Sequence, residues 1–422
     1  MYCTAAKSFR LGFAVALILT AWGLAPMTFG QVTPDYWLNP KGGSYADDAN
    51  WSLGAPGAYP NFNLGATNGY SVLLSSGEFA INPVIETDNP TFQLGGGTFT
   101  ADYLDVCDGA GTAGSLTLDG PGKFYQDIDP SYISVGNGSN AAQLIVNQAT
   151  VNQDGLQSGL YVAPGSTLTV ENGGTVEQTD LGGQAMNIAN LVVNSGTVTS
   201  QGNDIYFGSA TISNGSTVAA SGSGGILNIS GSVYLDGSNL SATSAIVFGS
   251  SASLTVTDGG YLNAFPYLTL PHMTDIASGL VQGGYVTFGS SLTMQLNLGL
   301  VKVFEGGNTL SAYDELVTTA PGEPSGTLNL DFPTGFSPVI GDVFNLFYWG
   351  DGVDSAFSQV NTPALPPGEY WDLSDLYTTG TVSIVPEPTS IALMLAAGGL
   401  LLRRRAARTP QPFSIRKIRR FV

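Results

Sequence analysis

The sequence predicts an all-β protein whose main part is a right-handed parallel β-helix, a solenoid closed by a C-terminal β cap or small sandwich. Three observations lead to this prediction. Short phrases of alternating apolar residues recur, glycine (56 of 422 residues) and asparagine follow them, and an apolar run adjoins basic residues near each end. The alternation predicts strands, and the glycines and asparagines predict tight corners. The two terminal runs predict an N-terminal signal helix and a short C-terminal transmembrane helix.

The first thirty residues have the layout of a secretory signal peptide. Lys7 and Arg10 precede a run of fourteen mostly apolar residues, LGFAVALILTAWGL, and a stretch of small residues ends at Gly30. The run is shorter than the roughly twenty residues of a transmembrane helix, which favours a signal peptide over a permanent anchor. We therefore expect passage through the Sec translocon and removal of residues 1–30, with cleavage after Gly23 as the alternative.

Residues 31–100 are expected to form an N-terminal β cap and the first coils. Trp37, GGSY at 42–45 and NWSLG at 50–54 combine aromatic and small residues, and this opening resembles that of autotransporter-like β-helix passengers. Aromatic side chains are suited to plug the first coil, whose open end would otherwise pair with other chains. A sugar-binding pair of tryptophans is the alternative.

Residues 101–284 are predicted to be the repeat region of the β-helix. Similar phrases such as TLTVENGGTV, from Thr167, and SLTVTDGGYL, from Ser253, recur every 17 to 28 residues. Periods of this size indicate a solenoid, whereas a β-sandwich, the alternative, would give paired hairpins. The stacked coils are expected to align one apolar position per phrase in an internal column: Leu118, Val146, Val170, Val193, Ile212, Ile229 and Val256.

Residues 285–385 have longer and more aromatic apolar stretches, such as DVFNLFYWG and YWDLSDLY. We interpret them as a C-terminal β region that continues the solenoid as a cap or small sandwich. Residues 325–385 look like the membrane-proximal β region that often precedes a Val-Pro-Glu-Pro signal.

The C-terminus has three parts in a fixed order. They are Val385-Pro386-Glu387-Pro388-Thr389-Ser390, the apolar run IALMLAAGGLLL, and the cluster Arg403, Arg404 and Arg405. Prolines end a strand, the run can be helical, and arginines hold its far end in the cytoplasm. Residues 386–405 resemble the PEP-CTERM sorting signal of Gram-negative bacteria. The resemblance implies a transient inner-membrane anchor recognised by an exosortase-type processing enzyme.

The basic tail, 406–422, departs from that pattern because it is long. It is interpreted as a disordered segment held near anionic lipid, or alternatively as an amphipathic membrane-surface segment.

The charge distribution limits the partners of the exported body. Between residues 31 and 385 there are three lysines, no arginine and 31 acidic residues, a formal charge of −28. Such a body is expected to bind no nucleic acid, and anionic membrane surfaces are poor partners for it. Cationic groups and divalent ions are more compatible with it.

Few residues could support catalysis or metal binding. His272 is the only histidine, so a site with several histidine ligands is excluded, and Cys107 loses its only possible partner, Cys3, with the signal peptide. A glycoside hydrolase needs only two carboxylates, and three pairs could supply them: Asp47 with Asp48, Asp105 with Asp108, and Asp351 with Asp354. Acids of this kind mostly occupy turns, so we predict no catalytic residue, no cofactor and no metal.

The sequence thus predicts a non-enzymatic protein, exported through the inner membrane to the cell surface or extracellular matrix, with a structural or exopolysaccharide-associated role. An adhesin or carbohydrate-binding protein that uses Trp349, Tyr370 and Trp371 is the first alternative, and a polysaccharide-cleaving β-helix enzyme is the second. Calcium at 105–109 or 349–355 is a further alternative, because both segments place oxygen ligands in turns.

Overall fold

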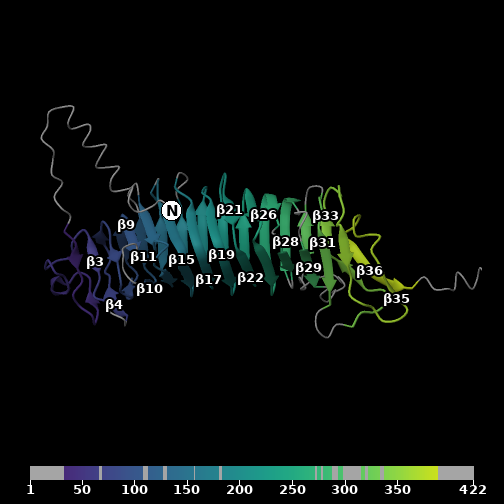
Figure 1. Ribbon diagram of the computed structural model, residues 1–422. Coiled ribbons are helices and arrows are strands. Elements are labelled where there is room, and N and C mark those ends of the chain that lie inside the picture. Colours follow the sequence, from purple (N-terminus) through teal and green to yellow (C-terminus); the bar gives the residue numbers. More distant parts are fainter. Residues whose placement is uncertain are drawn as a thin grey trace, which may run out of the picture.

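The computed structural model describes residues 33–387, except for 66–68, 108–112, 127–130, 156, 180–182, 271–272, 277–278, 288–292, 298–314, 319–321 and 333–336. These residues form one extended parallel sheet and a three-stranded antiparallel sheet near the C-terminal end. The described part of the chain has no α-helix, and its one helical element is a 3-10 turn, η1, at Asp48–Asn50. Figure 1 shows an elongated body wound from short strands.

Each complete turn of the chain contributes a strand, or part of a long strand, to each of three faces, named A, B and C in the order in which the chain visits them. Face A stacks β2 (Gly43–Ser44), β4 (Tyr70–Leu73), β7 (Pro90–Gln93), β10 (Gly114–Asp119), β13 (Ala142–Asn147), β15 (Gly159–Glu171), β17 (Met186–Asn194), β19 (Ile205–Ser213), β22 (Ser232–Asp236), β25 (Ser253–Thr257), β27 (Met273–Ile276), β29 (Thr293–Asn297), β31 (Thr327–Asp331) and β34 (Gln359–Asn361).

Face B stacks β5 (Glu78–Ala80), β8 (Thr98–Ala101), β11 (Lys123–Gln126), β14 (Thr150–Gln153), β16 (Thr175–Gln178), β18 (Thr197–Gln201), β20 (Thr217–Ser221), β23 (Asn239–Ala242), β26 (Gly260–Thr269), β28 (Gly279–Thr287), β30 (Glu315–Thr318) and β33 (Phe347–Trp349). Face C stacks β1 (Asp35–Tyr36), β3 (Pro60–Phe62), β6 (Val84–Ile85), β9 (Tyr103–Val106), β12 (Tyr132–Val135), β21 (Ile226–Ile229), β24 (Ala245–Phe248) and parts of the long strands β15, β17, β19, β26 and β28.

Neighbouring strands on each face pair in parallel and in register with the previous and the next turn, which is the arrangement of a β-solenoid. From β4 to β28 the chain makes about ten complete turns. The strands β15, β17 and β19 run from face C into face A without interruption, so one corner of the solenoid is a bend within a strand. The prediction of an all-β parallel solenoid is therefore confirmed.

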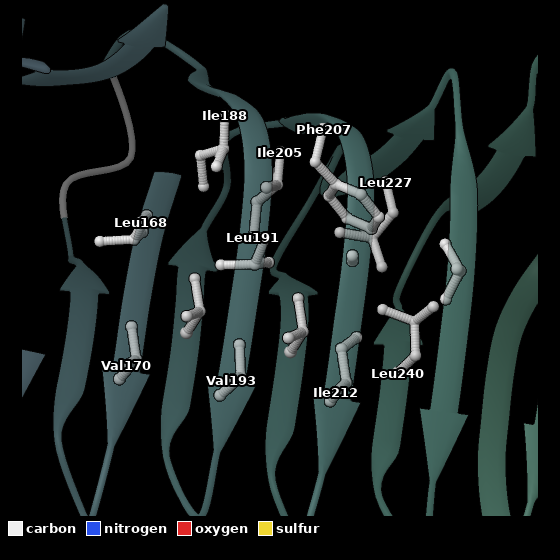
Figure 2. Packing of buried hydrophobic residues seen from close by; sticks show 14 of the residues in the cluster. Leu168, Val170, Ile188, Leu191, Val193, Ile205, Phe207, Ile212, Leu227 and Leu240 are labelled. Carbon is white, nitrogen blue, oxygen red and sulfur yellow. The ribbon is translucent and has the colours of Figure 1, made fainter. Parts of the chain in front are cut away.

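The core consists of columns of buried apolar side chains, one residue per turn. On face A the column runs through Leu118, Val146, Val170, Val193, Ile212, Leu235 and Val256, each paired with the next. Figure 2 shows Val170, Val193 and Ile212 at matching places on successive strands. The predicted column was wrong at Ile229, which lies on face C between Phe207 and Phe248, and Leu235 occupies its place.

Polar side chains also stack inside the solenoid. Gln126, Gln153 and Gln178 occupy successive turns of face B and are fully buried. The Gln153 amide nitrogen donates to the side-chain oxygen of Gln126 at 2.9 Å and to the Gly159 carbonyl at 3.0 Å. These bonds satisfy the Gln153 amide nitrogen and the Gln126 side-chain oxygen, which would be costly to bury alone, and they link face B to the start of face C at Gly159.

The corner between faces A and B uses asparagine, as the sequence predicts. Asn172 and Asn214 have φ values of +53° and +58°, a left-handed conformation that asparagine tolerates better than most residues. Their side-chain amides donate to Asn147 at 2.8 Å and to Asn194 at 2.6 Å on the preceding turns. The corner is therefore tied across turns by side chains as well as by the strand ladder.

An aromatic cluster fills the N-terminal end of the solenoid. Trp37, Tyr45 and Trp51 are almost fully buried, and the Trp51 ring lies 5.1 Å from the rings of both Trp37 and Tyr45. The two indole nitrogens donate within the cluster region, to the carbonyls of Asn39 and Tyr45. Because both indoles are buried and hydrogen-bonded internally, their position favours a plug over a sugar-binding pair.

At the other end the parallel ladder continues past residue 285, through β30 and β31 to β33 and β34. The change expected near that position therefore does not coincide with a change in strand pairing. The antiparallel sheet is formed by β32 (Val343–Asn345), β36 (Thr381–Pro386) and β35 (Glu369–Asp372), with β36 in the centre. In Figure 1 it lies at the yellow end of the body.

Several predicted segments lie outside the described residues. These are the signal peptide at 1–30, the sorting signal from residue 388 to residue 405, and the tail at 406–422. Pro386 and Glu387, the first residues of the sorting signal, are described. Within the part that the structure describes, no helix has the length and hydropathy needed to cross a bilayer.

Candidate functional site

The first half of the expected sorting motif belongs to the folded C-terminal sheet. Val385 and Pro386 end β36 opposite Tyr370 and Glu369, and the Glu387 backbone amide donates to the Gly368 carbonyl at 2.9 Å. Pro388, Thr389, Ser390 and the cluster Arg403, Arg404 and Arg405 lie outside the described residues. The motif thus starts at the edge of a folded element with no intervening linker.

The acidic pairs occupy turns and surface positions. The Asp47 carboxylate accepts the Ala49 backbone amide at 3.1 Å and caps η1, while its neighbour Asp48 is exposed in the first turn. Asp105 accepts from the Asn82 side chain at 2.9 Å, which ties two turns of face C, and Asp108 lies outside the described residues. Asp351 and Asp354 are exposed after β33.

Cys107 is the cysteine that the structure describes, and its side chain is buried. Burial is the main cause that raises the pKa of its thiol to about 11, so the thiolate is disfavoured. His272 lies outside the described residues. Among the residues that the structure does describe, no three His, Cys, Asp or Glu side chains gather closely enough to hold a metal ion.

The aromatic residues suggested for carbohydrate binding are mostly internal, contrary to expectation. The Trp349 indole donates to the Leu376 carbonyl at 2.8 Å and the Trp371 indole donates to the Pro363 carbonyl at 2.9 Å, and both rings are buried. The Trp371 ring stacks on Phe332, and the Trp349 ring stacks on Phe347. Only Tyr370, which is 57% exposed, presents its side chain to solvent.

A surface groove on face C is a better candidate site. It has a volume of about 500 Å³, within the range of ligand pockets, and it crosses β15, β17, β19, β21 and β24 on five successive turns. The outward side chains along it are Tyr161, Asn187, Tyr206, Asn228 and Val247. Each is paired in register with the next, so they form one row along the body.

The bottom of the groove is made by the bend between faces C and A. Small residues, among them Ala189, Gly208, Ser230 and Gly249, follow the inward apolar residue of each strand. A Cβ atom at Gly208 would collide with the carbonyl oxygen of Ala189. Glycine at position 208 therefore allows the two neighbouring turns to approach closely at the bend.

The electrostatic character of the groove differs from that of the whole body. The lining residues that the structure describes include no charged side chain. Beside it, the Tyr206 hydroxyl donates to Asp204 at 3.0 Å, and this hydrogen bond is the main cause that raises the pKa of Tyr206. The Tyr206 hydroxyl therefore keeps its proton to a higher pH than an ordinary tyrosine does.

The sequence contains a pattern that marks the strands of this groove, but the alternation of apolar residues alone does not distinguish these strands from those of the other faces. Leu160-Tyr161-Val162-Ala163, Met186-Asn187-Ile188-Ala189 and Ile205-Tyr206-Phe207-Gly208 repeat apolar, outward, apolar and small residues in that order. The outward position varies from phrase to phrase, and it is the position that meets solvent.

Compared with known proteins, the chain matches no family model, no curated protein and no solved structure. The interpretation of its function therefore depends on the chain's own sequence and geometry.

Proposed function

We propose that the protein is an exported, non-enzymatic rod that is sorted through its C-terminal signal to the cell surface or extracellular matrix, where it has a structural, exopolysaccharide-associated role. Its coils are taken to be right-handed, the hand that parallel β-crossovers adopt in nearly all proteins. The proposed partners are the Sec translocon, an exosortase-type processing enzyme and, transiently, the inner membrane.

The observation that supports this most is the position of β36. This strand is central in the C-terminal sheet and ends at Pro386, inside the motif that resembles a PEP-CTERM signal. A membrane segment that follows at once would hold the C-terminal end of the body at the membrane. The stacked turns would then extend away from it as a stiff body, which suits a structural role.

The test is a deletion that spares the folded sheet. Removing residues 388–422 leaves β36 and its pairing to Glu369 and Tyr370 intact. We expect this variant to lose surface delivery, whereas a deletion of 409–422, which keeps the three arginines, retains it. Fractionation of cells and mass spectrometry of the mature C-terminus provide the measurement, and unchanged surface delivery of the first variant would reject the sorting role.

Carbohydrate binding is the second candidate function. It is favoured by the uncharged groove on face C, where two tyrosines and two asparagines form one row. The exposed Tyr370 near the C-terminal end offers a further ring.

A further inference from the structure

The groove on face C has a direction. Its outward row takes one residue from each of five consecutive turns, from Tyr161 on β15 to Val247 on β24. Adjacent strands are about 4.8 Å apart, so the row is roughly 19 Å long and parallel to the long axis of the body. A ligand that occupies the whole groove must therefore be an extended chain.

The row also alternates in chemistry. Tyr161 and Tyr206 are two turns apart, roughly 10 Å, and Asn187 lies between them. Tyr206 is 41% exposed, so part of its ring is available to a ligand. Aromatic rings stack on the apolar faces of sugar rings, and an amide can both donate to and accept from hydroxyl groups. Asn228 repeats the amide on the turn after Tyr206.

Charge and backbone pairing narrow the class of ligand. A polyanion is disfavoured because the body has a formal charge of −28 and the described lining has no cation. An extended peptide usually binds by adding a strand to a free sheet edge. No such edge is offered here, because β17, β19 and β21 pair with a neighbour on both sides.

We propose that this groove binds a neutral, linear polysaccharide laid along the axis of the solenoid. Tyr161 and Tyr206 stack on its rings, and Asn187 and Asn228 hydrogen-bond its hydroxyl groups. The inference deepens the proposed exopolysaccharide-associated role. It depends on that role only for the location, the cell surface or extracellular matrix, at which the protein meets a polysaccharide. Binding by the purified protein is independent of export, so the two proposals can fail separately.

The experiment is affinity electrophoresis of the full chain in mild detergent, in gels that contain dextran, laminarin or hydroxyethylcellulose as neutral probes and alginate as the anionic one. We expect retardation by at least one neutral polysaccharide and none by alginate. The double variant Tyr161→Ala/Tyr206→Ala should weaken that retardation by at least about tenfold, because aromatic anchors dominate binding at such sites. Tyr206→Phe, which keeps the ring, should stay within about threefold.

The matched control is Tyr234→Ala on face A. Tyr234 is 42% exposed, close to the value for Tyr206, and its hydroxyl accepts a hydrogen bond from Thr257 at 3.2 Å. This variant should bind like the native chain, and circular dichroism checks that all variants keep their β content. Absence of retardation by every neutral probe, equal retardation by alginate, or equal losses in the Tyr234 and groove variants would overturn the proposal.

Discussion

The ends of the solenoid and its middle are stabilised in different ways. The N-terminal end relies on a three-dimensional aromatic cluster, in which Trp51 contacts Trp37, Tyr45 and Phe62. The middle turns rely on columns of aliphatic side chains, such as Val146, Val170 and Val193, each covered by identical or similar residues above and below. An interior turn is closed by its two neighbours, whereas a terminal turn has one neighbour and needs its own plug.

This difference predicts the largest loss of stability at the aromatic end. Trp51→Ala should lower the free energy of unfolding by about 3–5 kcal/mol, because a large buried ring is replaced by a cavity. The nearby Leu53→Ala, at a side chain that is 60% exposed, should change it by less than about 0.5 kcal/mol. Urea unfolding followed by tryptophan fluorescence and circular dichroism measures both, and similar values for the two variants would contradict the plug.

Cys107 lies where the aromatic end meets the aliphatic middle, between the turns that contain Phe99 and Phe124. Its thiol pKa of about 11 exceeds the usual value near 8.5, so at pH 8 the native thiolate fraction should be lower by roughly two orders of magnitude. In a Cys3→Ser background, we expect maleimide labelling of Cys107 at pH 8 to be slower in the native chain than in the urea-unfolded chain by at least this factor.

The same pKa gives the sign of a pH effect on stability. The native state holds the thiol proton more tightly than the unfolded state does. The contribution of the protonated Cys107 thiol to the free energy of unfolding is therefore fully present below about pH 8.5, and it is lost as the pH rises toward 11. Cys107→Ser should remove this alkaline dependence of stability. Equal labelling rates in native and unfolded chains would contradict the burial of the Cys107 thiol.

Within the middle, the buried glutamines should matter less than the aromatic end. Gln153→Ala removes two donated bonds and leaves the Gln126 side-chain oxygen and the Gly159 carbonyl without them. A loss of about 1–3 kcal/mol is expected from the unsatisfied groups. Gln157→Ala, at an exposed position in the same turn, provides the control. A loss above that of Trp51→Ala would reverse the proposed ranking of the two regions.

The corner residues should show the smallest effect. Asn172 has a φ of +53°, so Asn172→Ala should cost about 1 kcal/mol, while Asn172→Gly, which accepts that conformation, should cost a few tenths. The alternative is that the Asn172 side-chain bond to Asn147 dominates. In that case both variants would be equally destabilised in urea unfolding.

The sequence was sufficient to predict the repeat, the Gly and Asn corners and most of one core column. It was insufficient where faces had to be distinguished, because each turn carries three similar apolar phrases. Ile229 has the alternation of a face A strand but lies on face C, and the true residue, Leu235, restores spacings of 23 and 21 residues to Ile212 and Val256.

The site showed a second limit of the sequence. Trp349 and Trp371 are the residues that the sequence suggested for binding a sugar, yet both rings are buried and both indoles donate to backbone carbonyls. The row on face C could not be chosen beforehand, because Tyr161 and Tyr206 become neighbours of Asn187 only through the register of the turns. Side chains that face solvent carry no hydrophobic pattern of their own.

In-register stacking of the turns is the claim on which both the rod and the groove depend. Thr117 on β10 and Thr255 on β25 are outward positions of face A that are six turns apart in one row. Nitroxide labels at Thr117→Cys and Thr255→Cys, in a Cys3→Ser/Cys107→Ser background, allow their separation to be measured by pulsed electron paramagnetic resonance. The solenoid predicts a narrow distribution centred at roughly 29 Å. A distribution centred below about 20 Å, as in a folded-back sandwich, or one without a defined maximum would contradict the stacked arrangement.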